Sequence, residues 1–335
     1  MRSLAALVYA AVAIGSPCFG LRAQGTVIAE TRVNLRRDSS TERTPIRVLK
    51  ALERLAVTGA ARNGFLPVRT ERSETGWVSS DYVYPEGDEA LNAAAPPLRV
   101  IGLDAPAGAI SPNWERPPVG KSTLRHDPDD GTRCGARGAD GGDWETFILK
   151  NRSDVPTVSH AVTFAALEAL PFKTGGLGAD RADTGWTKAQ KAAVGRFEGI
   201  PLTITGFLAA VKQQGGSSGG EGTNCKFTGE ANTDWHMALV RTHRDSEPNA
   251  LVVEPTPRIK RKHPNWTKPM LAPWSGDERQ RTDSVRITGF LFYDPDHANH
   301  LRKYRRTMWE LHPVTRIEVF QNGAWVDVDD MQGPP

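Results

Sequence analysis

Short apolar runs separated by turn residues occupy the first part of the chain. Between two of these runs lies Asn63-Gly64, and Asn-Gly is a preferred pair for the two-residue turn of a β-hairpin. Closely spaced short strands with turns between them favour a small β barrel. The predicted strands are 27–28, 33–36, 48–49, 55–57, 65–68 and 76–78.

The second part of the chain combines helical and strand patterns. Residues 159–170 carry apolar positions at helical spacing, and Thr187 with Gln190 forms a capping-box pattern that predicts a second helix at 188–197. Three strands, a short helix and two further strands follow, which is the element order of the OB fold, a five-stranded Greek-key barrel. The predicted elements are strands 201–211, 235–240 and 251–254, helix 266–274, and strands 285–293 and 308–320.

A short repeat lies within two of these strands. The sequence ITGFL occurs at 204–208 and again at 287–291, with Gly206 and Gly289 in the middle of each strand. A mid-strand glycine permits the bulge or sharp bend that a small barrel requires. We interpret the repeat as shared geometry rather than as a duplication.

Several motifs resemble known families. VNLRRDSS at 33–40, NGFLPV at 63–68 and TGWVSSDYV at 75–83 resemble the bacterial SH3 domain, which is found in many exported and cell-wall-associated proteins. That resemblance implies peptidoglycan or a partner peptide as ligand, with Trp77 and Tyr82 as candidate contacts. NTDWHMALV, ALVVEPTPR, VRITGFLFYDPDH and TMWELHPVTRIEV resemble a group of exported bacterial OB-like proteins without a named activity.

Composition changes between the two parts. Residues 85–120 are rich in proline and alanine and predict a semi-extended linker, whose pieces 98–103 and 109–110 are apolar enough to dock on a neighbour. With 32 glycines and 24 prolines in 335 residues, turns must be frequent, which favours short strands over long helices. We therefore expect a mainly β protein: an SH3-like small barrel at 26–84, the linker, and an OB-like five-stranded Greek-key barrel with flanking helices at 121–330.

The N-terminus has the features of a signal peptide. Arg2 precedes an apolar run at 4–15, which is too short to span a bilayer, and cleavage is expected before Gln24. Pro17 next to Cys18 does not fit a lipidation motif. The composition, 39% hydrophobic and 24% charged, is that of a globular protein. We expect an exported protein, periplasmic or extracellular, without a transmembrane anchor.

The net charge bears on which partners to expect, and the cysteine content on which cross-links to expect. Loss of Arg2 and Arg22 with the signal peptide lowers the formal net charge from +3 to +1, so nucleic acid is not an expected partner. Cys134 and Cys225 remain, each in a glycine-rich stretch, and an exported compartment favours a disulfide between them across about 90 residues. Two free buried thiols are the alternative.

Polar residues in otherwise apolar strands are the sharpest chemical signal. Alternation places Glu310 and His312 on the same face of their strand. If that face meets His236 and Glu254 across the barrel, the cluster can bind a divalent metal or supply an acid and a base.

The competing interpretation is structural. The same side chains can form buried hydrogen bonds and ion pairs, with Arg305 or Arg316 as partner. We favour this interpretation, because no short-spaced ligand pair such as HExxH is present, and we expect no metal and no other cofactor.

A basic and aromatic group of residues is the remaining candidate for binding, since OB barrels use such loops to hold ligands. We expect a cell-envelope binding protein rather than an enzyme. Its SH3-like module would contact peptidoglycan, an envelope protein or a peptide, and its OB-like domain a second ligand. The alternative is a metal-assisted phosphodiester or ester hydrolase on the barrel. The candidate contacts on the barrel are Arg261, Lys262, Trp266, Tyr304 and Arg305.

Overall fold

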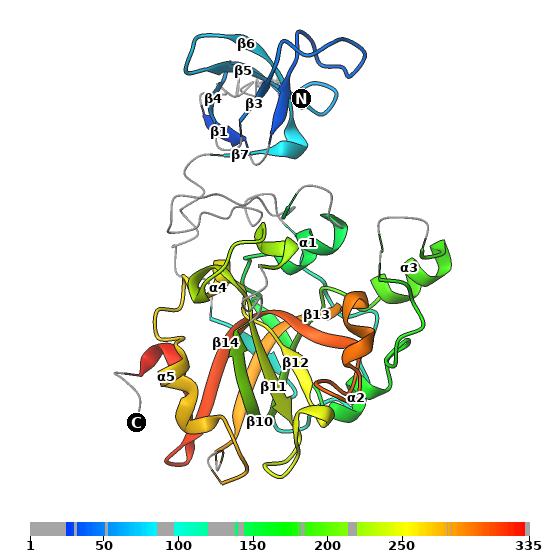
Figure 1. Cartoon of the computed structure of the whole chain (residues 1–335), viewed down its shortest axis with the longest axis vertical. Coiled ribbons are helices and arrows are strands. Elements are labelled where there is room, and N and C mark those ends of the chain that lie inside the picture. The colour runs from blue at the N-terminus through cyan, green and yellow to red at the C-terminus, as the bar shows by residue number, and fades with distance from the viewer. Residues whose placement is uncertain are drawn as a thin grey trace, which may run out of the picture.

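The computed structural model contains an N-terminal module and a larger C-terminal β barrel (Figure 1). The expected signal segment 1–23 and Cys134 lie outside the described residues. The structure describes residues 25–29, 32–50, 53–85, 97–119, 138–139, 144–179, 181, 185–213, 220–279, 281 and 283–331.

The N-terminal module is a small barrel-like β structure with its own apolar core, formed by buried residues from Val27 to Val83. Asn63 and Gly64 have φ angles of 50° and 76°, the left-handed geometry of the predicted hairpin turn. One sheet has the order β6-β5-β4-β1-β7, and β2 pairs with β3. These strands are β1 (Thr26–Ala29), β2 (Val33–Leu35), β3 (Arg47–Leu49), β4 (Arg54–Val57), β5 (Phe65–Thr70), β6 (Thr75–Ser79) and β7 (Val83–Pro85).

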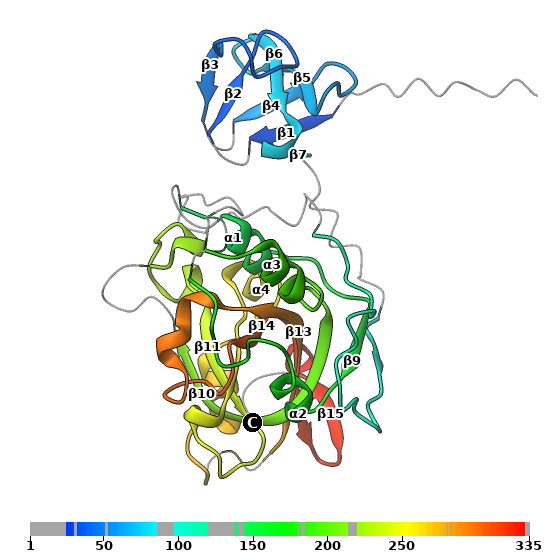
Figure 2. The same ribbon diagram turned by 90° about the vertical axis from the view of Figure 1, so that its right-hand side faces the viewer.

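The C-terminal strands close into the predicted five-stranded Greek-key barrel (Figures 1 and 2). The ring runs β10-β11-β12-β14-β13 and returns to β10. The β12–β14 contact is parallel and the other contacts are antiparallel, so the connectivity is OB-like. The elements are β10 (Pro201–Gln213), β11 (Trp235–Val240), β12 (Leu251–Val253), α4 (Pro257–Lys260), α5 (Lys268–Leu271), β13 (Val285–Tyr293) and β14 (Trp309–Gln321).

The ITGFL repeat marks two close backbone approaches. A Cβ atom on Gly206 would lie 2.5 Å from the carbonyl oxygen of Val240, and one on Gly289 would lie 2.8 Å from that of Pro313. The strand register also shifts at Gly289, between β13 and β14, and just after Leu208, between β10 and β11. The glycines therefore allow the strands to bend where neighbouring backbones come too close for a side chain.

Three strands extend the barrel sheet beyond the predicted set. β9 (Val158–Ala161) runs parallel to β10, and β8 (Arg99–Ile101) runs parallel to β9. β15 (Ala324–Asp327) pairs with β14. The residue range 97–119, expected to be linker, therefore packs on the barrel domain. The two apolar pieces expected to dock do so: 98–103 contains β8, and Ile110 of 109–110 is buried in the main core.

The helices follow the predicted signals in part. α3 (Lys188–Gly195) begins at the expected capping box of Thr187 and Gln190. The helix predicted at 159–170 is shorter, because β9 takes up its first residues and α2 (Phe164–Glu168) starts only after Thr163. α1 (Trp144–Lys150) was not predicted. In the part of the chain that the structure describes, no helix has the length and apolar character needed to cross a bilayer.

Candidate functional site

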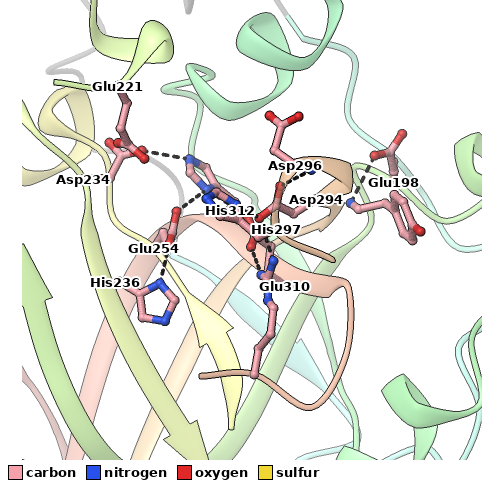
Figure 3. Close-up of polar contacts among 12 residues, drawn as sticks. Glu198, Glu221, Asp234, His236, Glu254, Asp294, Asp296, His297, Glu310 and His312 are labelled. Atoms are coloured by element: carbon pink, nitrogen blue, oxygen red, sulfur yellow. Dashed lines mark hydrogen bonds and ion pairs between the residues drawn. The ribbon is translucent and has the colours of Figure 1, made fainter. Parts of the chain in front are cut away.

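Adjacent strands of the barrel bring a group of ionisable side chains together at one end of the ring (Figure 3). Asp234 immediately precedes β11, Glu254 follows β12, and His312 lies within β14. The Glu254 amide donates to the carbonyl of Leu311, and the Val314 amide donates to the carbonyl of Glu254, each over 2.9 Å. We call this group the polar cluster; it consists of Lys150, Glu221, Asp234, His236, Glu254, Asp294, His297, Arg305, Glu310 and His312.

His312 occupies the centre of the polar cluster and is 1% exposed. Its Nδ1 lies 3.0 Å from Glu254 Oε2 and 3.2 Å from Glu310 Oε1, and its Nε2 lies 3.5 Å from Asp234 Oδ2. Burial lowers the pKa of His312, but the hydrogen bonds to Glu254 and Glu310 outweigh burial and raise it to about 10. With no ion bound at the polar cluster, the ring is therefore an imidazolium at neutral pH.

Glu254 joins the two histidines of the cluster. Its Oε1 lies 3.1 Å from His236 Nδ1, while Oε2 faces His312. Burial raises the pKa of Glu254, but hydrogen bonds from His236 and His312 outweigh burial and hold it well below its ordinary value. Glu254 is therefore an ionised carboxylate whose oxygens both accept from imidazole rings.

One side of the cluster is balanced in charge. The Arg305 guanidinium donates to Glu310 and, over 2.6 Å, to Asp294. His297 Nδ1 also lies 2.6 Å from Asp294 Oδ2. Lys150 of α1 is buried nearby; burial lowers its pKa, but the charges of Asp294 and Glu310 outweigh burial and raise it. On this side, two permanent cations face two carboxylates.

The opposite side is rich in acids. Asn224 donates from Nδ2 to Asp234 Oδ1 over 3.0 Å, and the same nitrogen lies 3.5 Å from Glu221 Oε2. Burial, followed by the charge of Asp234, raises the pKa of Glu221 to about 8, and burial raises the pKa of Asp234 as well. This side of the cluster therefore favours positive charge or protons.

The predicted candidates His236, Glu254, Glu310 and His312 thus lie together. One donor atom from each of Asp234, Glu254 and His312 lies within 4.8 Å of the others, which is compact enough for a metal site or for proton exchange.

Sequence reasoning did not select all members of the cluster. Asp234 directly precedes the apolar strand that contains His236, two residues before that histidine, and this charged position is the signal that marks it, although it was not selected as a candidate. Lys150 and Glu221 carried no such signal, since their positions depend on contacts between distant segments. Arg305 is a partner of Glu310, whereas Arg316 pairs instead with Glu318 and Asp327.

Two of the five ligand contacts expected on the barrel surface are buried, so that prediction was wrong for these two residues. Arg305 is 1% exposed and Trp266 is 4% exposed, so neither is available to a surface ligand. Trp266 stacks on His263 at 4.0 Å between ring centroids and belongs to the main core. Tyr304 and Lys262 are exposed, and Arg261 is half-buried. An aromatic residue beside basic residues in the sequence is therefore not by itself a sign of exposure, because its ring can be buried in the core, as that of Trp266 is.

The N-terminal module has a hollow of about 330 Å³ on its surface. Tyr82, a predicted contact, lines it, together with Phe65 and two arginines, Arg32 and Arg36. Trp77 is half-buried and is not part of this lining; its backbone pairs with that of Arg36.

Cys225 is disulfide-bonded. Its expected partner Cys134 lies outside the described residues, so the pairing remains a prediction. Cys225 directly follows Asn224, which holds Asp234. The disulfide therefore fixes the segment that orients the acidic side of the polar cluster.

Comparison with known families identifies one part of the chain. Comparisons with curated proteins and with solved structures gave no significant match. Residues 31–84 match the bacterial SH3 domain family, in agreement with the strand order and the motifs described above, whereas the barrel domain has no family match. The N-terminal module of this chain is a bacterial SH3 domain.

Proposed function

We propose that the protein is an exported binding protein of the bacterial envelope. Its SH3 domain contacts peptidoglycan or a partner peptide, and its barrel domain binds a second ligand. The observation that carries this proposal is the SH3 match at 31–84 together with the hollow beside Tyr82. Bacterial SH3 domains commonly bind cell-wall components.

The chemistry of the hollow suits a short peptide with a free carboxylate. Tyr82 and Phe65 offer aromatic faces, and Arg32, Arg36 and Asn34 line the same surface. Arginine is well suited to carboxylates because its planar guanidinium donates two parallel hydrogen bonds. Peptidoglycan stem peptides present such carboxylates, which makes the wall the favoured ligand.

Co-sedimentation with purified peptidoglycan tests this proposal. The full-length mature protein is expected to pellet with the wall at low and moderate salt, and Tyr82→Ala is expected to reduce the pelleted fraction. Phe320→Ala, which changes an exposed aromatic residue of the barrel domain, serves as the matched control. If the wild-type protein stays in the supernatant at every salt concentration, the wall is not the ligand and a protein partner replaces it.

Export is a separate part of the proposal and rests on the sequence of residues 1–23. N-terminal sequencing of protein produced in a bacterial host is expected to begin near Gln24. An intact Met1 or an acylated Cys18 would contradict it.

A metal-assisted phosphodiester or ester hydrolase is the second candidate function. It is supported by one observation, the position of His312 between Asp234 and Glu254. Turnover of nitrophenyl phosphodiester and ester substrates with added Zn²⁺ or Mn²⁺, lost in Asp234→Asn, would favour this candidate. Absence of turnover under these conditions would remove it.

A further inference from the structure

Two buried atoms of the polar cluster face each other without forming a hydrogen bond. Among the described residues, neither His312 Nε2 nor Asp234 Oδ2 has a hydrogen-bond partner. They lie 3.5 Å apart, and their side chains are 0% and 1% exposed. Buried polar atoms nearly always have a partner, so this pair points to a ligand located between the two side chains.

The contacts at Nδ1 of His312 make Nε2 the ring nitrogen that can donate an electron pair to a metal ion. Its Nδ1 faces the carboxylates of Glu254 and Glu310. Ionised carboxylates only accept hydrogen bonds, so Nδ1 must carry a proton. The lone pair of the neutral ring then lies on Nε2, facing Asp234. Metal-binding histidines have this arrangement, in which the other ring nitrogen donates to a carboxylate.

Asp234 is oriented in a complementary way. Asn224 donates to Oδ1 and leaves Oδ2 directed at His312. Donor atoms bound tetrahedrally at about 2.0 to 2.2 Å lie roughly 3.3 to 3.6 Å from one another, and the Nε2–Oδ2 separation falls within that range. The same Asn224 nitrogen lies near Glu221, which supplies a further carboxylate from the loop before β11 (Figure 3).

Charge also favours a cation on this side of the cluster. Arg305 and Lys150 compensate Asp294 and Glu310 on the other side. Asp234, Glu221 and Glu254 remain; imidazole rings contact Asp234 and Glu254, and Lys150 acts on all three carboxylates only as a charge at longer range, as Lys260 does on Asp234. Buried carboxylates require compensating charge, and a divalent ion supplies it while leaving His312 neutral.

We propose that His312 Nε2 and Asp234 Oδ2 bind a divalent transition-metal ion, that the Glu221 side chain turns toward the ion as the third ligand, and that Glu254 positions His312. Zn²⁺ fits this donor set best, because it accepts one imidazole and two carboxylates in a small tetrahedral site, whereas Ca²⁺ and Mg²⁺ prefer six or more oxygen ligands. A metal ion bound here would give the cluster a role besides the structural one expected from the sequence, and its binding does not depend on wall binding by the SH3 domain.

Calorimetric titration of the metal-free full-length mature protein with Zn²⁺ tests the site. The wild-type protein is expected to bind one ion. Asp234→Asn keeps the shape and a hydrogen-bonding group but removes the ligand charge, and it should weaken binding by more than about 100-fold. Glu254→Gln should weaken it by about 10- to 100-fold, the range for residues that orient a ligand. Co²⁺ provides a second readout, since its visible absorption reports tetrahedral coordination.

His243→Gln is the matched control, because it removes an exposed histidine of the same domain; its affinity for Zn²⁺ should equal that of the wild type. If Asp234→Asn does not fold, as judged by circular dichroism, Glu221→Gln replaces it, since Glu221 is only half-buried. Failure of the wild-type protein to bind Zn²⁺ stoichiometrically would overturn the proposal. Wild-type affinity in the folded Asp234→Asn or Glu221→Gln protein would do the same.

Discussion

The guanidinium of Arg305 donates to the carboxylate of Glu310 although the two side chains are 1% and 0% exposed. The same guanidinium also binds Asp294. Such a pair contributes little net stability relative to apolar residues, but removing one partner leaves a buried charge without compensation. The polar cluster therefore depends on both members being present.

Arg305→Met is expected to lower the free energy of unfolding by about 3 to 5 kcal/mol, because Glu310 and Asp294 lose their cation. Adding Glu310→Leu should recover part of that loss, which a double-mutant cycle in urea would measure. The neighbouring Arg306→Met is the control; its ion pair with Glu168 is exposed, so the change should stay within about 1 kcal/mol. Strictly additive losses at Arg305 and Glu310 would contradict the coupling.

The two glycines of the ITGFL repeat predict a second stability effect. Gly206→Ala and Gly289→Ala each place a Cβ within 2.8 Å of a backbone oxygen, so each should destabilise the barrel by roughly 1 to 3 kcal/mol. Gly108→Ala is the control, because a Cβ at Gly108 meets nothing within 4 Å. Urea unfolding curves compare the variants. Equal stability of all the variants would show that the strands relax without cost.

The sequence predicted the elements that depend on local interactions, and it did not predict those that depend on contacts between distant segments. The strands 235–240 and 285–293 were predicted with the bounds of β11 and β13, because local apolar runs end at clear turn residues. The segment of β8 was expected to dock on a neighbour, but β8 and β9 were not predicted as strands, since their parallel pairing depends on segments far apart in the chain. The same reason explains the polar cluster: His312 stood out within its own strand, whereas Lys150 enters the cluster only through the position of α1.

The disulfide of Cys225 yields a third prediction. Cys225→Ser is expected to lower the free energy of unfolding by about 2 to 5 kcal/mol, because the cross-link restricts the unfolded chain. Peptide mapping without reductant should recover Cys134 and Cys225 in one linked fragment. Recovery of Cys134 as a free thiol in the oxidised protein would disprove the predicted pairing.

Lys260 predicts a pH dependence. Burial lowers its pKa from 10.5 to about 8, while Nζ donates to the carbonyls of Glu230 and Thr233 over 2.6 and 2.8 Å. Between pH 8 and 10.5 the unfolded chain binds more protons at this residue than the folded chain does, so the contribution of Lys260 to stability rises with pH.

The variant Lys260→Met should lack this rise. Melting temperatures from pH 7 to 10 are therefore expected to increase more steeply, or to fall less steeply, in the wild type than in Lys260→Met. Lys303→Met, at an exposed lysine, should follow the wild-type curve. Parallel curves for the wild type and Lys260→Met would show that the ammonium is not disfavoured by folding.

Glu254 has two roles in the barrel, one through its backbone and one through its side chain. β12 and β14 share a single register pair, Val253 with Leu311, and the backbone of Glu254 adds hydrogen bonds on either side of His312, to Leu311 and from Val314. The side chain of the same residue holds the His312 ring. The contact that closes the ring of strands and the contact that orients the His312 ring are therefore made by the same residue. Any molecule or ion that engages His312 therefore also opposes local opening between β12 and β14, and occupancy of the cluster is thermodynamically linked to amide exchange along that short parallel contact.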